Sequence, residues 1–471
     1  MELNNYAIGF ETQSRECAPT ELEVHGTLPD WLTGRLLRSA PATFEFEEQA
    51  MNHWFDGMAM LFKFDIKGGR VTFQNKHLQS QAYTQGKAEG KLVRSEFGTD
   101  PCRQLFGKVM SFFQSPELSD NGNVTIGKFD GKYMAISETP LMLTFDPETL
   151  ETGELYQYED KLKGQVNPAH WLTDKQGNIY NYLLKFGMSS FYQIYKQSPG
   201  THKREKIAEL SASRPSYMHS FAMTEHYVIL TENPYRVNPA HLKFGNNTIA
   251  EGYTWHPDQK SQFRIFDKQS GELVKTIETD PFFCFHHVKA FERDGILIVD
   301  LIAFDDPHFI DCLYLDNLRS NVPVNVVGTL TRFYLDFNHK KGQPVKTRVL
   351  CDTKIELPQF NSDFQTEEYR YIYGCGTETE GNFLDCIVKI DTHTGESSRW
   401  YHEDHYPSEP VFVWSPTPES EDDGVLLSVV LDVATKSTYL LVLDARDLSE
   451  LARAEAPILL PFGFHGHFYP S

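Results

Sequence analysis

The chain has 471 residues, more than one ordinary hydrophobic core contains, so it forms either several domains or one closed repeat architecture. Its hydrophobic content of 40 % excludes a disordered chain, and its net charge of −21 argues against nucleic acid as a partner. The seven cysteines form no CxxC pair, the first residues lack a leader pattern, and no apolar run approaches the roughly 20 residues of a spanning helix. These features predict a cytoplasmic protein with reduced thiols.

Short predicted strands and tight turns follow one another along the whole chain. Two of the clearest strands, 295–302 and 424–431, begin at Asp-Gly dipeptides, which supply the positive φ angles of a hairpin. No linker or low-complexity segment divides the sequence, so we predict a single domain over residues 1–471.

A strand followed by a turn recurs seven times. The turns stand in chain order at Asp65, Asp146, Lys196, Asp267, Asp336, Asp391 and Asp444. Their spacing of 50 to 81 residues fits the blades of a β-propeller, which repeat at roughly 40–50 residues and lengthen by insertion. An ordinary β-rich fold in which such turns are simply common is the alternative interpretation.

Histidines and glutamates recur at one position of this repeat. Four histidines follow a turn by 19 to 24 residues, and two glutamates follow two of the remaining turns by 18 and 20 residues. In chain order these residues are His170, His219, His286, Glu356, Glu409 and His465. This offset corresponds to the innermost strand of the next blade, so we expect the six side chains to face the axis of the propeller.

Four imidazoles around one axis predict a metal site. Imidazole nitrogen binds Zn, Cu, Fe and Ni, and carboxylates that accept the other ring N–H would fix each tautomer and offset the charge of the ion. The chain has 18 histidines, however, and a single histidine is more often a surface or hydrogen-bonded core residue than a ligand. Spacing also leaves open whether His286 or His287, and whether His465 or His467, faces the metal.

The motifs around these residues resemble the carotenoid cleavage oxygenase family, and most closely its animal-type branch of β-carotene oxygenases and a retinoid isomerase. The resemblance covers nearly the whole chain. Its histidine motifs stand here as Asn167-Pro-Ala-His170, Tyr217-Met-His219-Ser-Phe, Phe285-His286-His287-Val and Phe464-His465-Gly466. The matching glutamates are Glu138 in Ser137-Glu-Thr, Glu356 in Glu356-Leu-Pro-Gln, and Glu409 in Pro407-Ser-Glu-Pro. The resemblance therefore assigns His286 and His465 as the ligands in the two ambiguous pairs, and it adds Glu138.

The resemblance implies an all-β fold: a seven-bladed β-propeller with a cap of loops and short helices over its top face and Fe(II) on its axis. It implies a non-haem Fe(II)-dependent dioxygenase that uses O2 to split a conjugated C=C bond of a carotenoid or apocarotenoid, near the centre, into retinal-type aldehydes. An apolar polyene and O2 are then the substrates, and no catalytic residue beyond the iron ligands is needed. The alternatives are a retinoid ester isomerohydrolase on the same fold and a non-catalytic propeller that binds apolar ligands.

One segment departs from the family pattern. The animal-type motif Pro-Asp-Pro-Cys stands here as Thr99-Asp-Pro-Cys102, and in the isomerase this region is tied to membrane attachment. The sequence therefore leaves open whether Cys102 is lipidated. The surrounding run, residues 100–113, mixes bulky apolar and basic side chains and predicts a membrane-facing or substrate-entry segment, or else a short helix packed on the propeller. We expect peripheral contact with membranes, in which the substrates dissolve.

Overall fold

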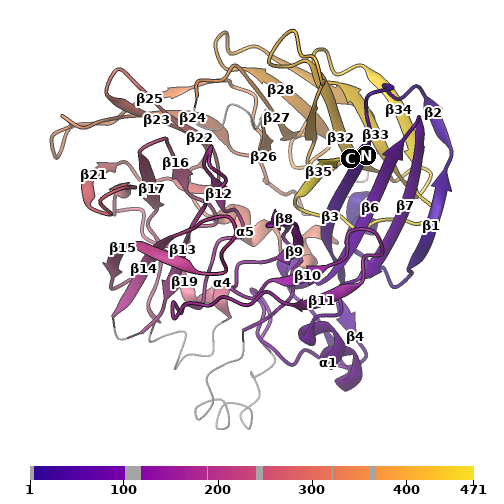
Figure 1. The fold of residues 1–471 in the computed structure, drawn as a ribbon, viewed down its shortest axis with the longest axis horizontal. Helices are drawn as coiled ribbons and strands as arrows, with labels where there is room; N and C mark the ends of the chain where they lie inside the picture. The colour runs from indigo at the N-terminus through magenta and orange to yellow at the C-terminus, as the bar shows by residue number, and fades with distance from the viewer. Residues whose placement is uncertain (1–4, 101–117, 188, 240–247, 321, 361–366) are drawn as a thin grey trace.

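The computed structural model describes residues 5–100, 118–187, 189–239, 248–320, 322–360 and 367–471. In these residues β-strands predominate, and they form seven sheets of four to six strands around a common centre (Figure 1). This arrangement confirms the predicted all-β fold and the seven-bladed propeller. That residues 1–471 form a single domain stays a prediction.

Each sheet is one blade, and we number the blades 1 to 7 and give their strands from the centre outwards. The first four blades are blade 1 with β35 (Gly466–Pro470), β3 (Gly34–Thr43), β6 (Met58–Lys67), β7 (Arg70–His77) and β1 (Cys17–Leu22); blade 2 with β8 (Thr125–Phe129), β9 (Lys132–Ile136), β10 (Leu143–Phe145) and β11 (Thr152–Leu155); blade 3 with β12 (Leu172–Thr173), β13 (Ile179–Lys185), β14 (Ser190–Gln197) and β15 (Arg204–Ala212); and blade 4 with β16 (Ala222–Met223), β17 (Tyr227–Glu232), β20 (Ser261–Asp267) and β21 (Leu273–Thr279).

The remaining three blades follow the same plan. They are blade 5 with β22 (Phe283–Arg293), β23 (Ile296–Phe304), β24 (Thr329–Asp336) and β25 (Lys346–Val349); blade 6 with β26 (Glu356–Gln359), β27 (Tyr371–Gly376), β28 (Cys386–Asp391) and β29 (Ser397–Tyr401); and blade 7 with β30 (His405–Pro407), β32 (Gly424–Asp432), β33 (Ser437–Asp444), β34 (Glu450–Glu455) and β2 (Val24–Gly26), in which β31 (Val411–Trp414) also pairs with β32. All pairings are antiparallel, so each blade is built from consecutive hairpins apart from the strands that close the ring.

The seven predicted turns all join the third strand of a blade to the fourth. In five of them the aspartate side chain accepts a hydrogen bond from the main-chain N–H two residues further on, as at Asp146, Asp267 and Asp444. A short carboxylate side chain that bonds to its own backbone in this way stabilises a tight turn. This local chemistry explains why the same residue type recurs once per blade.

The two ends of the chain close the ring together. Strand β35 pairs with β3 inside blade 1, and β2 pairs with β34 in blade 7, so a C-terminal strand completes blade 1 and an N-terminal strand completes blade 7. The core lies between adjacent blades, as where Leu36 of blade 1 and Leu440 of blade 7 belong to one buried cluster. Burial of such apolar surface against both neighbours holds each blade in the ring.

Short helices and small hairpins form the predicted cap over one end of the propeller. They are η1 (Asn5–Phe10), β4 (Glu45–Phe46), β5 (Gln49–Ala50), η2 (Trp54–Asp56), α1 (Gln81–Glu89), β18 (Tyr235–Val237), α4 (Ile249–Gly252), β19 (Tyr253–Trp255), α5 (His308–Cys312) and α6 (Leu315–Leu318). Insertion of α1, of β18 with α4 and β19, and of α5 with α6 lengthens the chain between turns 65 and 146, 196 and 267, and 267 and 336, which are the three longest spacings in the sequence. The cap packs through aromatic rings; Phe10, for example, lies 5.4 Å from Trp54 between ring centroids.

Candidate metal centre

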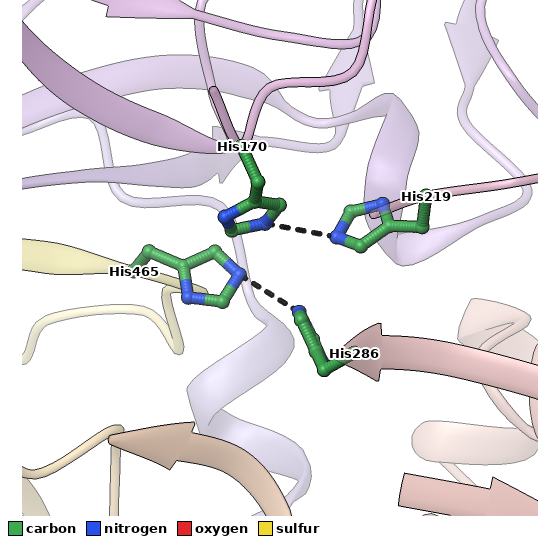
Figure 2. Close-up of side chains that lie close together, drawn as sticks. All are labelled: His170, His219, His286 and His465. Carbon is green, nitrogen blue, oxygen red and sulfur yellow. Dashed lines mark hydrogen bonds between the residues drawn. The ribbon is translucent and has the colours of Figure 1, made fainter. Parts of the chain in front are cut away.

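The four predicted histidines converge on the axis of the propeller, each from a different blade (Figure 2). His170 and His219 stand just before the innermost strands β12 and β16, His286 lies within β22, and His465 immediately precedes β35. These positions are equivalent in the repeat, because each lies where the chain crosses from the rim of one blade to the centre of the next. The structure thus places the four histidines in or just before the innermost strands of their blades.

The ring nitrogens lie close enough together to share one ion. The Nε2 atoms of His170 and His219 are 3.0 Å apart, and those of His286 and His465 are 3.2 Å apart. One nitrogen from each of the four rings lies within 4.8 Å of all the others. Three of the four residues are buried, and His170 is the partly exposed one. The group can hold one metal ion.

Three of the histidines have a glutamate on the outer side of the ring, and these are the three glutamates that the sequence predicts. Nδ1 of His219 lies 2.6 Å from Glu138, Nδ1 of His286 lies 2.5 Å from Glu356, and Nδ1 of His465 lies 2.7 Å from Glu409. A carboxylate in this position accepts the Nδ1 proton, fixes the tautomer and orients the ring. Among the described residues His170 contacts no carboxylate.

The positions of the glutamates follow from the same ring of blades. Glu356 is the first residue of β26, and Glu409 lies between β30 and β31, both at the inner edge of their blades. Glu138 instead follows β9, the second strand of blade 2, and it reaches His219 in blade 4. Each blade thus contributes one of the seven residues, with histidines from blades 1, 3, 4 and 5 and glutamates from blades 2, 6 and 7.

The contacts between the rings suit a cation rather than an empty centre. A neutral imidazole that donates from Nδ1 carries a lone pair on Nε2. His286 and His465 both donate to a glutamate, so lone pairs face each other across their 3.2 Å separation and repel. Metal–imidazole bonds of about 2.1 Å at right angles place two nitrogens about 3.0 Å apart, which matches both close pairs. The donor set therefore fits a first-row transition metal.

The pKa shifts and buried charges of the site also favour a bound cation. Burial, together with the neighbouring rings, holds the pKa of His170 and of His465 well below the usual range of histidine, so both are neutral and available as ligands. Burial likewise raises the pKa of Glu409, against which the charge of Arg38 acts. Glu356 Oε1 is fully buried and has no hydrogen-bond partner among the described residues. A positive ion on the axis would offset such buried negative charge.

The two ambiguous histidines lie apart from the four-histidine group. The His287 ring is held between the hydroxyls of Ser220, 2.8 Å away, and Thr231, 2.7 Å away. His467 follows His465 into β35, and its Nε2 lies 3.4 Å from the hydroxyl of Thr125. Both rings therefore serve local packing, and the geometry favours His286 and His465 as the residues that face the metal.

Two features of the site were not anticipated from the repeat. The hydroxyl of Tyr217 donates to both oxygens of Glu138, at 3.1 and 3.0 Å. The ring of Phe285 stacks on His219 with centroids 3.8 Å apart. In the quoted motifs Tyr217 stands two residues before His219 and Phe285 stands directly before His286, which is the one signal in the sequence that could have identified them.

Aromatic side chains also pack beside the histidines. Phe55 of η2 lies 5.8 Å from Phe285 and 5.2 Å from Phe464 between ring centroids. Tyr217 stacks on Phe285 at 6.1 Å. These rings come from the cap and from three blades, and they form an apolar wall beside His219, on which Phe285 stacks.

A seven-bladed propeller with histidines and glutamates on its axis defines a class of metalloprotein, and comparison with known proteins identifies the family. The family described as "Retinal pigment epithelial membrane protein" matches residues 10–470. The mitochondrial carotenoid-cleaving dioxygenase of Macaca fascicularis is 35 % identical over 95 % of this chain and 91 % of its own length. The human β,β-carotene 15,15'-dioxygenase is 32 % identical over 97 % of this chain and 93 % of its own.

Solved structures of this family have the same fold. A point mutant of the Synechocystis apocarotenoid oxygenase superposes with a TM-score of 0.87 at 25 % identity and covers 99 % of this chain and 98 % of its own. A cobalt-substituted form of the same cyanobacterial protein gives a TM-score of 0.86 at 26 % identity, over 99 % and 98 % of the two chains. The chain thus belongs to the carotenoid cleavage oxygenase family, in its animal branch, and is an oxygenase.

The predictions about membranes are tested only in part. In the described part of the chain, no helix is both long and apolar enough to cross a membrane. Cys102 and residues 101–113 lie outside the described residues, so lipidation of Cys102 and the membrane-facing or entry role of this run stay predictions.

Proposed function

We propose that this oxygenase is a non-haem Fe(II) enzyme that cleaves a conjugated C=C bond of a carotenoid or apocarotenoid with O2 to give two aldehydes. The observation that carries the proposal is the set of four histidines on the axis of the fold, three of which are hydrogen-bonded to glutamates. His170, His219, His286 and His465 would hold the iron. Glu138, Glu356 and Glu409 would keep three of the rings oriented and balance the ionic charge.

Iron(II) suits an all-imidazole site and would supply the activation of O2 that the reaction needs. The protein's own part is to bind and orient the polyene. The apolar wall of Phe55, Phe285 and Phe464 would stack against a conjugated chain and exclude water from the reacting bond. We assign no general base, because the cleavage of an alkene by O2 requires no proton to be removed from the substrate.

The substrate is proposed from the chemistry of the relatives. The names of the curated relatives refer to carotenoids, and one of them to cleavage at the 15,15' bond. We propose cleavage near the central double bond, which yields retinal-type aldehydes. The apolar substrate also supports peripheral contact with membranes, where polyenes dissolve.

The test measures metal, oxygen and product together. The purified protein is analysed for iron and incubated in air with β-carotene and with a series of apocarotenals; aldehydes are separated by chromatography and O2 uptake is followed with an electrode. We expect bound iron, aldehydes, and O2 consumed in proportion to product. A protein that binds no iron and forms no aldehyde would refute the proposal.

The same experiment separates the alternatives. An isomerohydrolase on this fold would convert a retinyl ester without consuming O2, and a non-catalytic propeller would bind the polyene unchanged. Replacement of His219 by alanine should abolish iron binding and catalysis under either enzymatic function, and should leave simple apolar binding in place under the third.

A further inference from the structure

A completely buried arginine lies behind the last histidine of the metal centre. Arg38 belongs to β3, has an exposed fraction of 0 %, and pairs with Gly466 across the seam where β35 closes the ring. Arginine is rarely buried without a specific partner, because transfer of its charge out of water is costly. The cost of burying the charge of Arg38 must therefore be offset by specific contacts of its guanidinium.

The guanidinium of Arg38 holds two segments that flank His465. Its Nη1 donates to the main-chain carbonyl of Glu409 at 3.1 Å, and its Nη2 donates to that of Phe464 at 3.2 Å. Phe464 directly precedes His465, and Glu409 accepts the Nδ1 proton of the same histidine. The planar fork of the arginine thus fixes the ligand and its carboxylate relative to each other from one rigid strand.

The carboxylate of Glu409 accepts two further hydrogen bonds beside Arg38. Its Oε1 accepts from Gln359 at 2.8 Å, and its Oε2 accepts the main-chain N–H of Gly466 at 2.9 Å. A Cβ on Gly466 would lie 2.6 Å from Cγ of Arg38, so the arginine is packed directly against this strand. Any shift of the Arg38 side chain would therefore displace both Glu409 and His465.

The charges of this region also balance. Three carboxylates, Glu138, Glu356 and Glu409, contact the histidines, and Arg38 contributes one positive charge. Their sum of −2 equals the charge that a divalent cation would cancel, given neutral histidines. A buried cluster whose charges sum to zero avoids most of the penalty for burying each charge alone.

We propose that Arg38 is a positioning residue for the metal centre: it fixes His465 and Glu409 across the ring closure and so sets the affinity of the metal. This inference rests on the proposed function of the four histidines as metal ligands. The arginine touches neither substrate nor metal and acts through the two main-chain carbonyls.

The test compares Arg38→Met and Arg38→Lys with a matched control, Arg332→Met. Arg332 is also a buried arginine on a strand, but it pairs with Asp300 at 2.8 Å and contacts none of the seven residues of the metal centre. Each full-length protein is stripped of metal, and Co(II) affinity and the visible absorption of the bound cobalt are measured on the folded fraction. These readouts require neither substrate nor turnover.

We expect Arg38→Met to bind Co(II) at least tenfold more weakly than the wild type and with an altered spectrum. Arg38→Lys, which keeps the charge but cannot bridge two carbonyls, should be intermediate. Arg332→Met should unfold at lower temperature yet bind Co(II) normally once folded. If Arg38→Met does not fold, Arg38→Lys against the control decides the question.

Two results would overturn the inference. Unchanged affinity and spectrum in the Arg38 variants would show that the arginine serves only the fold. Tighter binding would show that it acts on the ion merely as a like charge. A wild type that binds no Co(II) would instead refute the four-histidine metal site itself, so the two failures are distinguishable.

Discussion

Nδ1 of His286 and Oε2 of Glu356 lie 2.5 Å apart, although 70 residues separate them in the chain. The histidine belongs to blade 5 and the glutamate to blade 6. The other two pairs also cross between blades, with His219 of blade 4 bonded to Glu138 of blade 2 and His465 of blade 1 bonded to Glu409 of blade 7. The candidate metal centre is therefore complete only when the ring of blades is closed.

This relationship predicts the effect of removing one carboxylate charge. Replacement of Glu356 by glutamine keeps an acceptor for His286 but removes the negative charge that stabilises the ion. Such outer partners of a metal ligand typically contribute about 10- to 100-fold in metal affinity. We expect a loss of this size in competition titrations with a chelator. Wild-type affinity in the variant would mean that Glu356 only supports the fold.

Replacement of a histidine in the four-histidine group and replacement of a histidine beside it should have different effects on iron content. Replacement of His286 or His465 by alanine should lower the iron content of the purified protein below one-tenth of the wild type, since each removes one of four ligands. His287→Ala and His467→Ala are the matched controls, because their rings contact hydroxyls rather than the centre. They should lower the melting temperature while leaving iron content intact. Loss of iron in a folded His287→Ala protein would contradict the assignment.

The hydroxyl of Tyr217 should be needed to hold Glu138. Tyr217→Phe removes a hydrogen bond that is shared between the two oxygens of a carboxylate, and a hydrogen bond to a charged group contributes about 1.5–3 kcal/mol. We expect iron to be retained but kcat to fall by tenfold or more, because the orientation of His219 is loosened. Tyr373→Phe, which loses a hydroxyl bond to the main chain of Ala445, is the control and should keep full kcat. Equal loss in both variants would point to a general stability effect.

The cap should make the fold sensitive to acid through His53. Burial lowers the pKa of this histidine to about 3, whereas it is about 6.5 in an unfolded chain. The unfolded state therefore binds the extra proton first, and stability is lost as the pH falls below about 6.5. At pH 5 the loss from this group is about 2 kcal/mol.

The measurement compares urea unfolding at pH 7 and pH 5 for the wild type and His53→Gln. The wild type should lose about 2 kcal/mol more than the variant over this interval. The comparison is necessary because Asp56, whose pKa burial raises to about 6, shifts stability in the opposite sense. Parallel pH profiles for the two proteins would show that His53 does not titrate as its burial requires.

Much of the centre could be inferred without coordinates because it is tied to a local repeat. The turn aspartates bond to their own backbone, so they mark the same point of every blade in the sequence itself. Counting from them places His170 or His465 at an inner strand. Counting from the turns does not identify Glu138, because this residue follows the second strand of its blade and does not precede the first.

The sequence by itself determined the seven-bladed repeat and the residue types on its axis, since both depend on short-range turn chemistry and strand order. Only the tertiary structure decided which carboxylate orients which histidine, that Tyr217 holds Glu138, and that Arg38 reaches the carbonyl of Phe464, 426 residues away. These contacts arise from closure of the ring, which brings the last strand, β35, against β3. No local pattern encodes the distance between two side chains that meet only across that closure.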